Sequence, residues 1–145
     1  MLSQLNKIEK SIKFKDIFNL YGTDFKKIMN HPNLPEDFID EYFYRLKPWH
    51  LEIHQTLSEY LINKYQDNLN WQLLSKHQIL TEKQIENHYT YVNWKFISIS
   101  QKLSLKFMKK WMNYLDHISL TYNKHINIDD LIKFQNFVQK QKAKQ

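Results

Sequence analysis

Apolar residues recur along this chain at a fixed interval of 23 positions, and four such columns share one register. The columns are Leu34, Leu57, Leu80, Leu103 and Ile126; Ile28, Leu51, Leu74, Ile97 and Leu120; Ile39, Ile62, Ile85, Met108 and Leu131; and Leu46, Leu69, Val92, Leu115 and Val138. A constant period of about 20 to 50 residues is typical of repeat arrays, in which each unit packs against its neighbours. The pattern therefore predicts a stack of repeats.

The polar residues within one period predict two helices joined by a turn. In residues 57–79, Ser58 can cap a first helix because its hydroxyl accepts a hydrogen bond from an orphan backbone N–H group. Asn70 can cap a second, shorter helix in the same way, and Thr81 begins a T-x-x-Q capping box in the next period. The corresponding cap positions are Ser58, Thr81 and Ser104 for the first helix, and Asp24, Asn70, Asn93 and Asp116 for the second.

These signals predict an all-α fold, a stack of about five helix-turn-helix repeats in one domain of residues 1–145. We expect an N-terminal cap helix in residues 1–22, repeats in 23–126, and a C-terminal cap helix with a basic tail in 127–145. Gly22, the only glycine, should end the first helix, which is expected to begin near residue 2. The inward face of the last helix is expected to consist of Ile128, Leu131, Phe134 and Val138.

Two details of the repeat carry further expectations. Lys47 and Pro48 replace the usual Asn-Trp pair, so the helix that follows them is expected to be tilted or rotated. An aromatic column also keeps the 23-residue interval, and helix packing explains it better than a base-stacking platform. Its members are Tyr42, Tyr65, His88, Trp111 and Phe134.

Composition narrows the classes of function. The chain has no cysteine, which excludes disulfides, thiolate zinc sites and cysteine nucleophiles. It has no apolar run long enough for a membrane span or a signal peptide, so an intracellular protein is expected. The net charge of +6 permits acidic or phosphate-rich partners, although an AT-rich genome would also produce a lysine-rich chain. Arg45 is the only arginine, which argues against sequence-specific reading of nucleic acid.

Residues 92–108, with the sequence VNWKFISISQKLSLKFM, resemble a short helical repeat of giant viruses and bacteriophages written V-N-W-x-x-I-S-x-x-Q-x-L-S-E-x-F-I. Residues 69–82 are a second close match, and weaker copies extend over about residues 23–138. This repeat family is mostly uncharacterised. The resemblance implies a viral or phage origin and an interaction role in the host cytoplasm, and it transfers no catalytic residue.

Histidine spacing offers one candidate metal site. His50 and His54 are four residues apart on a predicted helix, a spacing that lets two imidazoles share a zinc ion, but no third ligand can be identified. His31, His54 and His77 also form a column with the 23-residue interval, in which adjacent side chains would be too far apart to share an ion. We therefore predict no metal and no cofactor.

No motif indicates catalysis. The serines occupy cap or helix positions, and the acidic residues Glu36, Asp37, Asp40 and Glu41 fit the solvated start of a helix. The protein is therefore predicted to be a non-enzymatic, macromolecule-binding repeat module without a small-molecule substrate. Its candidate partner-binding residues differ between copies or form a basic strip. They are Lys76, Lys83, Asn87, Lys95, Ile99, Lys106, Lys109 and Lys110.

Three partner hypotheses remain open at this point. The first is a viral or phage factor that binds and inhibits a host protein. The second is a basic protein that binds nucleic acid directly or inhibits a nucleoprotein defence complex such as a guided nuclease. The third is a structural or assembly component, which would associate with itself.

Overall fold

The computed structural model of this chain describes residues 14–144, and every regular element in that range is an α-helix. The predicted all-α class is therefore confirmed. The N-terminal helix was predicted from about residue 2, and its part before residue 14 lies outside the described residues. The chain divides into two compact units, one ending at Leu73 and the other beginning at Leu74.

Within each unit, short helices follow one another in pairs. The first unit contains α2 (Phe14–Tyr21), α3 (Phe25–Met29), α4 (Glu36–Tyr42), α5 (Pro48–His54) and α6 (Glu59–Lys64). The second contains α8 (Glu82–Asn87), α9 (Trp94–Ser100), α10 (Leu105–Lys110), α11 (His117–Thr121) and α12 (Ile128–Lys142). Residues of α7 (Trp71–His77) belong to both units.

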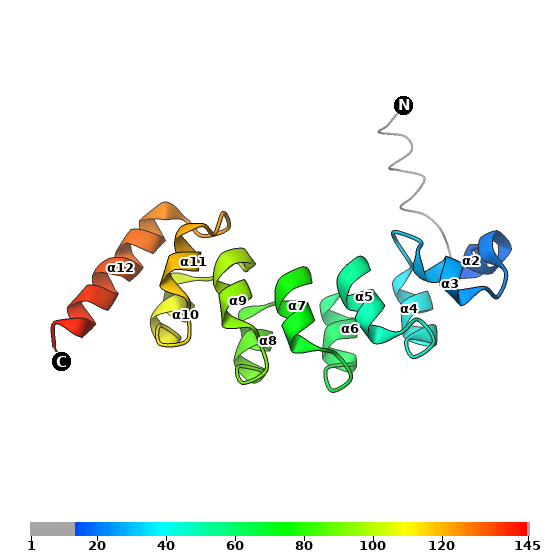
Figure 1. The fold of residues 1–145 in the computed structure, drawn as a ribbon, viewed down its shortest axis with the longest axis horizontal. Coiled ribbons are helices and arrows are strands. Elements are labelled where there is room, and N and C mark those ends of the chain that lie inside the picture. Colours follow the sequence, from blue (N-terminus) through cyan, green and yellow to red (C-terminus); the bar gives the residue numbers. More distant parts are fainter. Residues whose placement is uncertain (1–13, 145) are drawn as a thin grey trace, which may run out of the picture. The chain divides into compact units, whose positions relative to one another are not determined.

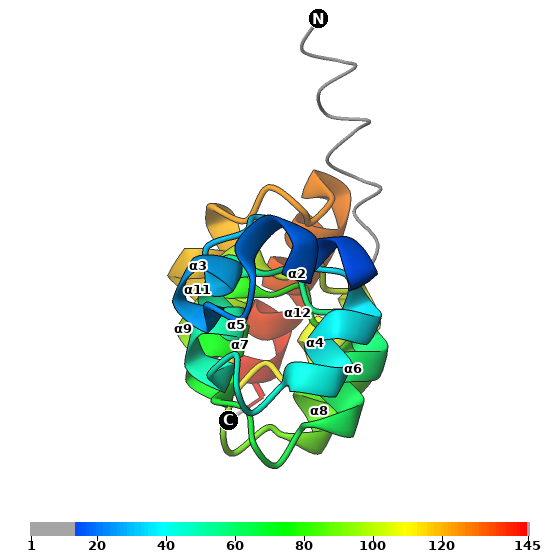
Figure 2. The same cartoon turned by 90° about the vertical axis from the view of Figure 1, so that its right-hand side faces the viewer.

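Each unit has two layers of helices. In the first unit α2, α4 and α6 lie in one layer, and α3 and α5 lie in the other (Figures 1 and 2). In the second unit α8, α10 and α12 form one layer, while α9 and α11 form the other (Figures 1 and 2). Neighbours within a layer pack together, as α10 does with α12 and α9 with α11. The predicted stacking of neighbouring helices is therefore present inside each unit.

The four apolar columns form the core. The column of Ile28, Leu51, Leu74, Ile97 and Leu120 is fully buried, and Ile62, Ile85 and Met108 are at most 1% exposed. Ile126 is the exception among the column members, because it is only partly buried. Burying each of these side chains contributes roughly 1.5–3 kcal/mol, so the repeat is the main source of stability.

The predicted caps begin the helices. The side chains of Ser58, Thr81 and Ser104 accept hydrogen bonds from the backbone N–H groups of Leu61, Gln84 and Phe107. Thr81 and Gln84 form the predicted capping box. The caps of the second helices are confirmed as well, and they are Asp24, Asn70, Asn93 and Asp116.

A ladder of buried glutamines joins consecutive copies, and it was not predicted from the sequence. The Gln101 side-chain Nε2 donates to the backbone oxygen of Gln78 at 2.7 Å, and its Oε1 accepts from the N–H group of Leu80 at 2.9 Å. Gln55 does the same in the first unit, donating to His31 O at 2.6 Å and accepting from Leu34 N at 3.0 Å. The amide therefore satisfies both polar groups of a neighbouring loop, which are costly to bury unpaired.

A second polar column supports the start of the next helix pair. The Ser75 hydroxyl accepts from the N–H group of Asn93 at 3.0 Å, and Ser98 accepts from Asp116 at 2.9 Å. In the first unit the corresponding residue is Glu52, whose Oε1 accepts from the N–H group of Asn70 at 2.6 Å. The serine and glutamine of the recurring I-S-x-x-Q sequence thus both hold neighbouring copies together.

Three details concern individual expectations. Gly22 follows α2 with a φ angle of 56°, as predicted for a glycine that ends a helix. Lys47, at the position where other copies have an Asn or Asp cap, has a φ angle of 54° and no side-chain cap hydrogen bond. Ile128 was predicted to face inward, and this was wrong: the side chain is 65% exposed, because it lies at the first position of α12 and away from the stripe of Leu131 and Phe134.

Candidate functional site

The positive charge of the chain belongs to its second unit. Residues 74–145 contain 12 of the 21 lysine and arginine residues but only 5 of the 15 aspartate and glutamate residues. The first unit is nearly neutral, with 9 basic and 10 acidic residues. Attraction of an acidic partner is therefore a property of the second unit.

Three of the predicted binding residues line one cavity in this unit. Lys83 on α8 and Lys106 on α10 hold the same position in consecutive copies, so the stack brings them to one face. Lys110 lies one helical turn beyond Lys106. Together with Glu82, Glu86 and Phe107, they surround a cavity of about 290 Å³.

The charges around this cavity interact directly. The Nζ atom of Lys110 lies 2.9 Å from Glu86 Oε1, and the indole N–H of Trp111 donates to the same oxygen at 3.2 Å. These two hydrogen bonds, that of Lys110 being the stronger, hold the pKa of Glu86 below its usual value, and Lys106 contributes through its charge. Glu86 is thus ionised at neutral pH and fixes Lys110 at the rim of the cavity.

Beside this cavity lies a cluster of aromatic rings from the first residue of α9 and from the segments that follow α8 and α10. Trp94 stacks against Trp111 with ring centroids 5.2 Å apart, and Tyr114 contacts both rings at 5.1 and 5.3 Å. Tyr89 completes the cluster at 5.3 Å from Trp111. Tyr89 and Tyr114 are 40% and 49% exposed. The aromatic column was predicted to serve helix packing, and its buried members such as Phe134 do so. The cluster around Trp111 differs, because part of its aromatic surface is open to solvent.

The other predicted binding residues do not join this surface. Lys76 and Lys95 lie in the layer of α7 and α9, where Lys76 Nζ is 5.5 Å from the centre of the Phe96 ring, and Ile99 is exposed on α9. Lys109 points to the other neighbour of α10, with its Nζ 5.2 Å from the Phe137 ring of α12. Asn87 is exposed at the end of α8. The eight residues therefore belong to at least two faces.

The histidines of the first unit form a cavity of about 280 Å³. His31, His50 and His54 all contribute to its wall, with the rings of His50 and His54 4.4 Å apart. Burial, aided by the charges of His54 and Lys47, lowers the pKa of His50. His31 Nδ1 already accepts from the N–H group of Asn33, and the described residues contain no group of three side chains arranged to hold a metal ion.

One acidic residue of α4, Asp40, has a structural role that spacing alone did not reveal. Asp40 accepts hydrogen bonds from Lys64 at 2.7 Å and from the hydroxyl groups of Tyr65 at 2.8 Å and Tyr60 at 3.2 Å. The hydrogen bond from Lys64 contributes most to lowering the pKa of Asp40. Asp40 thus links α4 to α6 and is committed to the repeat interface.

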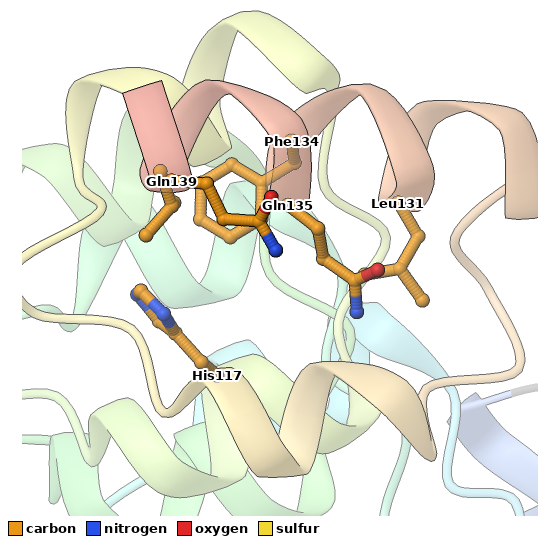
Figure 3. A pocket seen from close by; sticks show the side chains of 6 residues that line it. His117, Leu131, Phe134, Gln135 and Gln139 are labelled. Carbon is orange, nitrogen blue, oxygen red and sulfur yellow. The ribbon is translucent and has the colours of Figure 1, made fainter. Parts of the chain in front are cut away.

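Two surface features were missed from the sequence. The exposed tyrosines Tyr89, Tyr91 and Tyr114 lie in loops, and the 23-residue interval that joins Tyr91, Tyr114 and Phe137 was overlooked. The other feature is a cavity between α11 and α12, shown in Figure 3, where the ring of Phe134 meets that of His117 edge to face.

Comparison of the chain with models of protein families, with curated proteins and with solved structures gives no match in any of the three. Among the residues that the structure describes, no helix has the length and apolar character needed to cross a membrane.

Proposed function

We propose that this protein is a non-catalytic binding module whose second unit binds an acidic partner protein. The observation that carries the proposal is the gathering of Lys83, Lys106 and Lys110 around one cavity, in the unit that contains most of the positive charge. Repeat stacks present continuous surfaces of this kind, and electrostatic complementarity mainly increases the rate and selectivity of association.

The titratable groups support a binding role over a catalytic one. Shifted pKa values often mark active sites, but the lowered pKa values of Glu86, Asp40 and Asp116 result from contacts that stabilise the fold. Glu86 is held by Lys110, and Asp40 by Lys64. The pKa of Asp116 is lowered chiefly by the backbone N–H group of Ser119, which it caps.

The recurring sequence supports one class of partner. The V-N-W-x-x-I-S-x-x-Q pattern resembles repeats of giant viruses and bacteriophages, which supports a viral or phage factor that acts on a host protein in the host cytoplasm. Such a factor would inhibit the host protein by covering part of its surface, which requires binding but no catalytic step.

The experiment compares capture by three immobilised forms of the protein from a nuclease-treated lysate of a susceptible host. The test variant is Lys83→Glu/Lys106→Glu, and the matched control is Lys26→Glu/Lys27→Glu, which makes the same change of charge on α3 in the first unit. A protein that the wild type and the control retain, and that the test variant loses, supports the proposal. Equal capture by all three forms would refute it.

A second candidate function is supported by the aromatic cluster. Exposed rings beside lysines can stack with unpaired bases, and Lys110 Nζ lies 5.4 Å from the ring of Trp111. Anisotropy titrations of a labelled single-stranded oligonucleotide at about 50 and 200 mM salt test this. If the three lysines contact phosphates, log K should fall with log salt with a slope of about −2. Absence of binding at the lower salt concentration rules out direct contact.

A further inference from the structure

The histidine pocket of the first unit, formed by His31, His50 and His54, lies where two neighbouring helices meet. His31 belongs to the loop that follows α3, and the other two histidines belong to α5. The two helices are neighbours in one layer (Figure 1). The rest of the cavity wall consists of Met29, Asn30, Pro32 and Gln55. The pocket therefore gathers three imidazoles, and its wall contains no carboxylate that could balance their charge.

Two of these histidines are placed so that a neutral ring fits better than a charged one. His31 is 6% exposed, and its Nδ1 accepts a hydrogen bond from the N–H group of Asn33 at 3.2 Å. A proton on this nitrogen would turn the acceptor into a donor and break the bond. The Nδ1 atom of His50 is buried and has no hydrogen-bond partner among the described residues. A charged His50 ring would carry an N–H group there without an acceptor, which is costly to bury.

The charges that act on His50 also oppose its protonation. The rings of His50 and His54 are 4.4 Å apart, so two charged imidazoles would repel each other. Lys47, which precedes α5, adds a further positive charge. Burial is the largest cause of the lowered pKa of His50, followed by the charges of His54 and Lys47. All three causes act in the same direction.

The other titratable groups near this pocket do not compensate. On α3, Asp24 lies 3.8 Å from Lys27, and neither residue lines the cavity. At the end of α2, the ring of Tyr21 contacts that of His31 edge to face. On α5, Glu52 accepts from the N–H group of Asn70 at 2.6 Å, away from the cavity wall. Burial raises the pKa of Glu52, so its protonation in acid favours the folded form and acts against the histidines.

The contact between α5 and the loop after α3 depends on Gln55, the residue next to His54. Its Nε2 donates to the backbone oxygen of His31 at 2.6 Å, and its Oε1 accepts from the N–H group of Leu34 at 3.0 Å. Repulsion across the pocket therefore acts on the two chain segments that these hydrogen bonds join. An open form, in which the imidazoles reach water, binds protons more readily and gains population as the pH falls.

We propose that the histidine pocket is an acid-sensitive switch, in which protonation of its imidazoles releases α5 from the loop that follows α3. Because the pKa of His50 is lowered in the closed form, its contribution to stability is complete above pH 6.5, the ordinary value, and is lost as the pH falls below it. The switch goes beyond the proposed binding function. It lies wholly within the first unit and does not depend on the lysine surface of α8 and α10.

Native-state hydrogen exchange of the full chain tests the proposal, with protection factors corrected for the intrinsic effect of pH on exchange. The protection factor of the Leu34 amide should fall at least about tenfold between about pH 7.5 and 5.0, since an opening that takes up one proton becomes tenfold more populated per pH unit. The Leu80 amide is the internal control and should keep its protection factor. It is the equivalent amide two copies later, bonded to Gln101 Oε1 at 2.9 Å, where Phe96 and Ser100 replace the two histidines of α5.

The double variant His50→Phe/His54→Ser gives α5 the residues of that later copy and should abolish the acid response of Leu34. Glu52 is unchanged in it, so the difference from the wild type isolates the histidines. The single variant His54→Ser, at an exposed position, should already reduce the response. His77→Asn, at the exposed end of α7, is the matched control and should respond as the wild type does. The proposal is overturned if Leu34 loses no more protection than Leu80. It is also overturned if the acid response survives the histidine variants of α5 or disappears in His77→Asn.

Discussion

Replacement of Gln101 by leucine tests the idea that buried amides hold neighbouring copies together. Leucine fills most of the volume of glutamine but removes its three hydrogen bonds, to Ser75 O at 3.3 Å, Gln78 O at 2.7 Å and Leu80 N at 2.9 Å. The side chain is only 3% exposed, so water cannot readily replace these partners. A buried polar group left without a partner costs about 1–3 kcal/mol.

Two well-formed hydrogen bonds are lost from groups that stay buried, so the expected destabilisation is about 2–4 kcal/mol. Urea unfolding followed by circular dichroism measures this difference. Hydrogen exchange adds a local readout, because the Leu80 amide should lose its protection while the Phe107 amide, capped by Ser104, should keep its own. Gln72→Leu on the exposed face of α7 is the control and should change stability by less than about 0.5 kcal/mol.

The isosteric change Gln101→Glu isolates the donor. A glutamate at this position keeps the acceptor for Leu80 N but, when ionised, brings negative charge to the Gln78 oxygen. Its pKa should therefore be raised in the folded state, and the variant should lose stability as the pH rises. If Gln101→Leu unfolds within about 0.5 kcal/mol of the wild type, or the Leu80 amide stays protected, the amide ladder does not contribute to stability as argued.

Three further changes test other parts of the structure. Burial raises the pKa of Glu52, so Glu52→Gln, which keeps an acceptor for the neighbouring N–H group, should raise the melting temperature at pH 7 and give no gain near pH 4; a loss at pH 7 would contradict this. Lys64 lowers the pKa of Asp40, so Asp40→Asn should reduce stability at pH 7, with a difference that shrinks as the pH falls below 3.8; a difference independent of pH would count against the ion pair. Gly22→Ala should lower the free energy of unfolding in urea by about 1–2 kcal/mol, because an alanine is strained at a φ angle of 56°. No atom lies within 4 Å of the added Cβ, so backbone strain is the whole cost, and an unchanged midpoint would mean that the turn relaxes.

The sequence predicted the fold well because its main determinants are periodic. Burial needs only a repeated apolar position, and helix starts need only a polar residue at a fixed offset. Ile62, Ile85 and Thr81 could therefore be assigned their roles directly. The glutamines at 55, 78 and 101 share the same interval and were overlooked, although a buried polar column was readable in the same way.

The binding surface was predicted less well, since exposure and pairing depend on packing between copies. Lys83, Lys106 and Lys110 meet at one cavity, but Lys109 turns to Phe137 and Lys76 lies in the other layer. The two tryptophans of the recurring sequence also differ, since Trp71 is 6% exposed and Trp94 is only partly buried. Such differences between equivalent residues arise from the side chains that pack around them, and the 23-residue alignment of the copies does not show those contacts.

The links between copies also determine how the chain should respond to pulling. Each amide reaches only the adjacent copy, as Gln101 does with residues 75, 78 and 80, so no hydrogen bond of this ladder connects distant copies of a unit. The chain should therefore extend under force by successive detachment of single copies. Each step would release 23 residues, or roughly 80 Å of contour length, giving a sawtooth of small, evenly spaced events. A protein built in this way lengthens in many small steps under load, whereas one with a single central core would unfold in one large step.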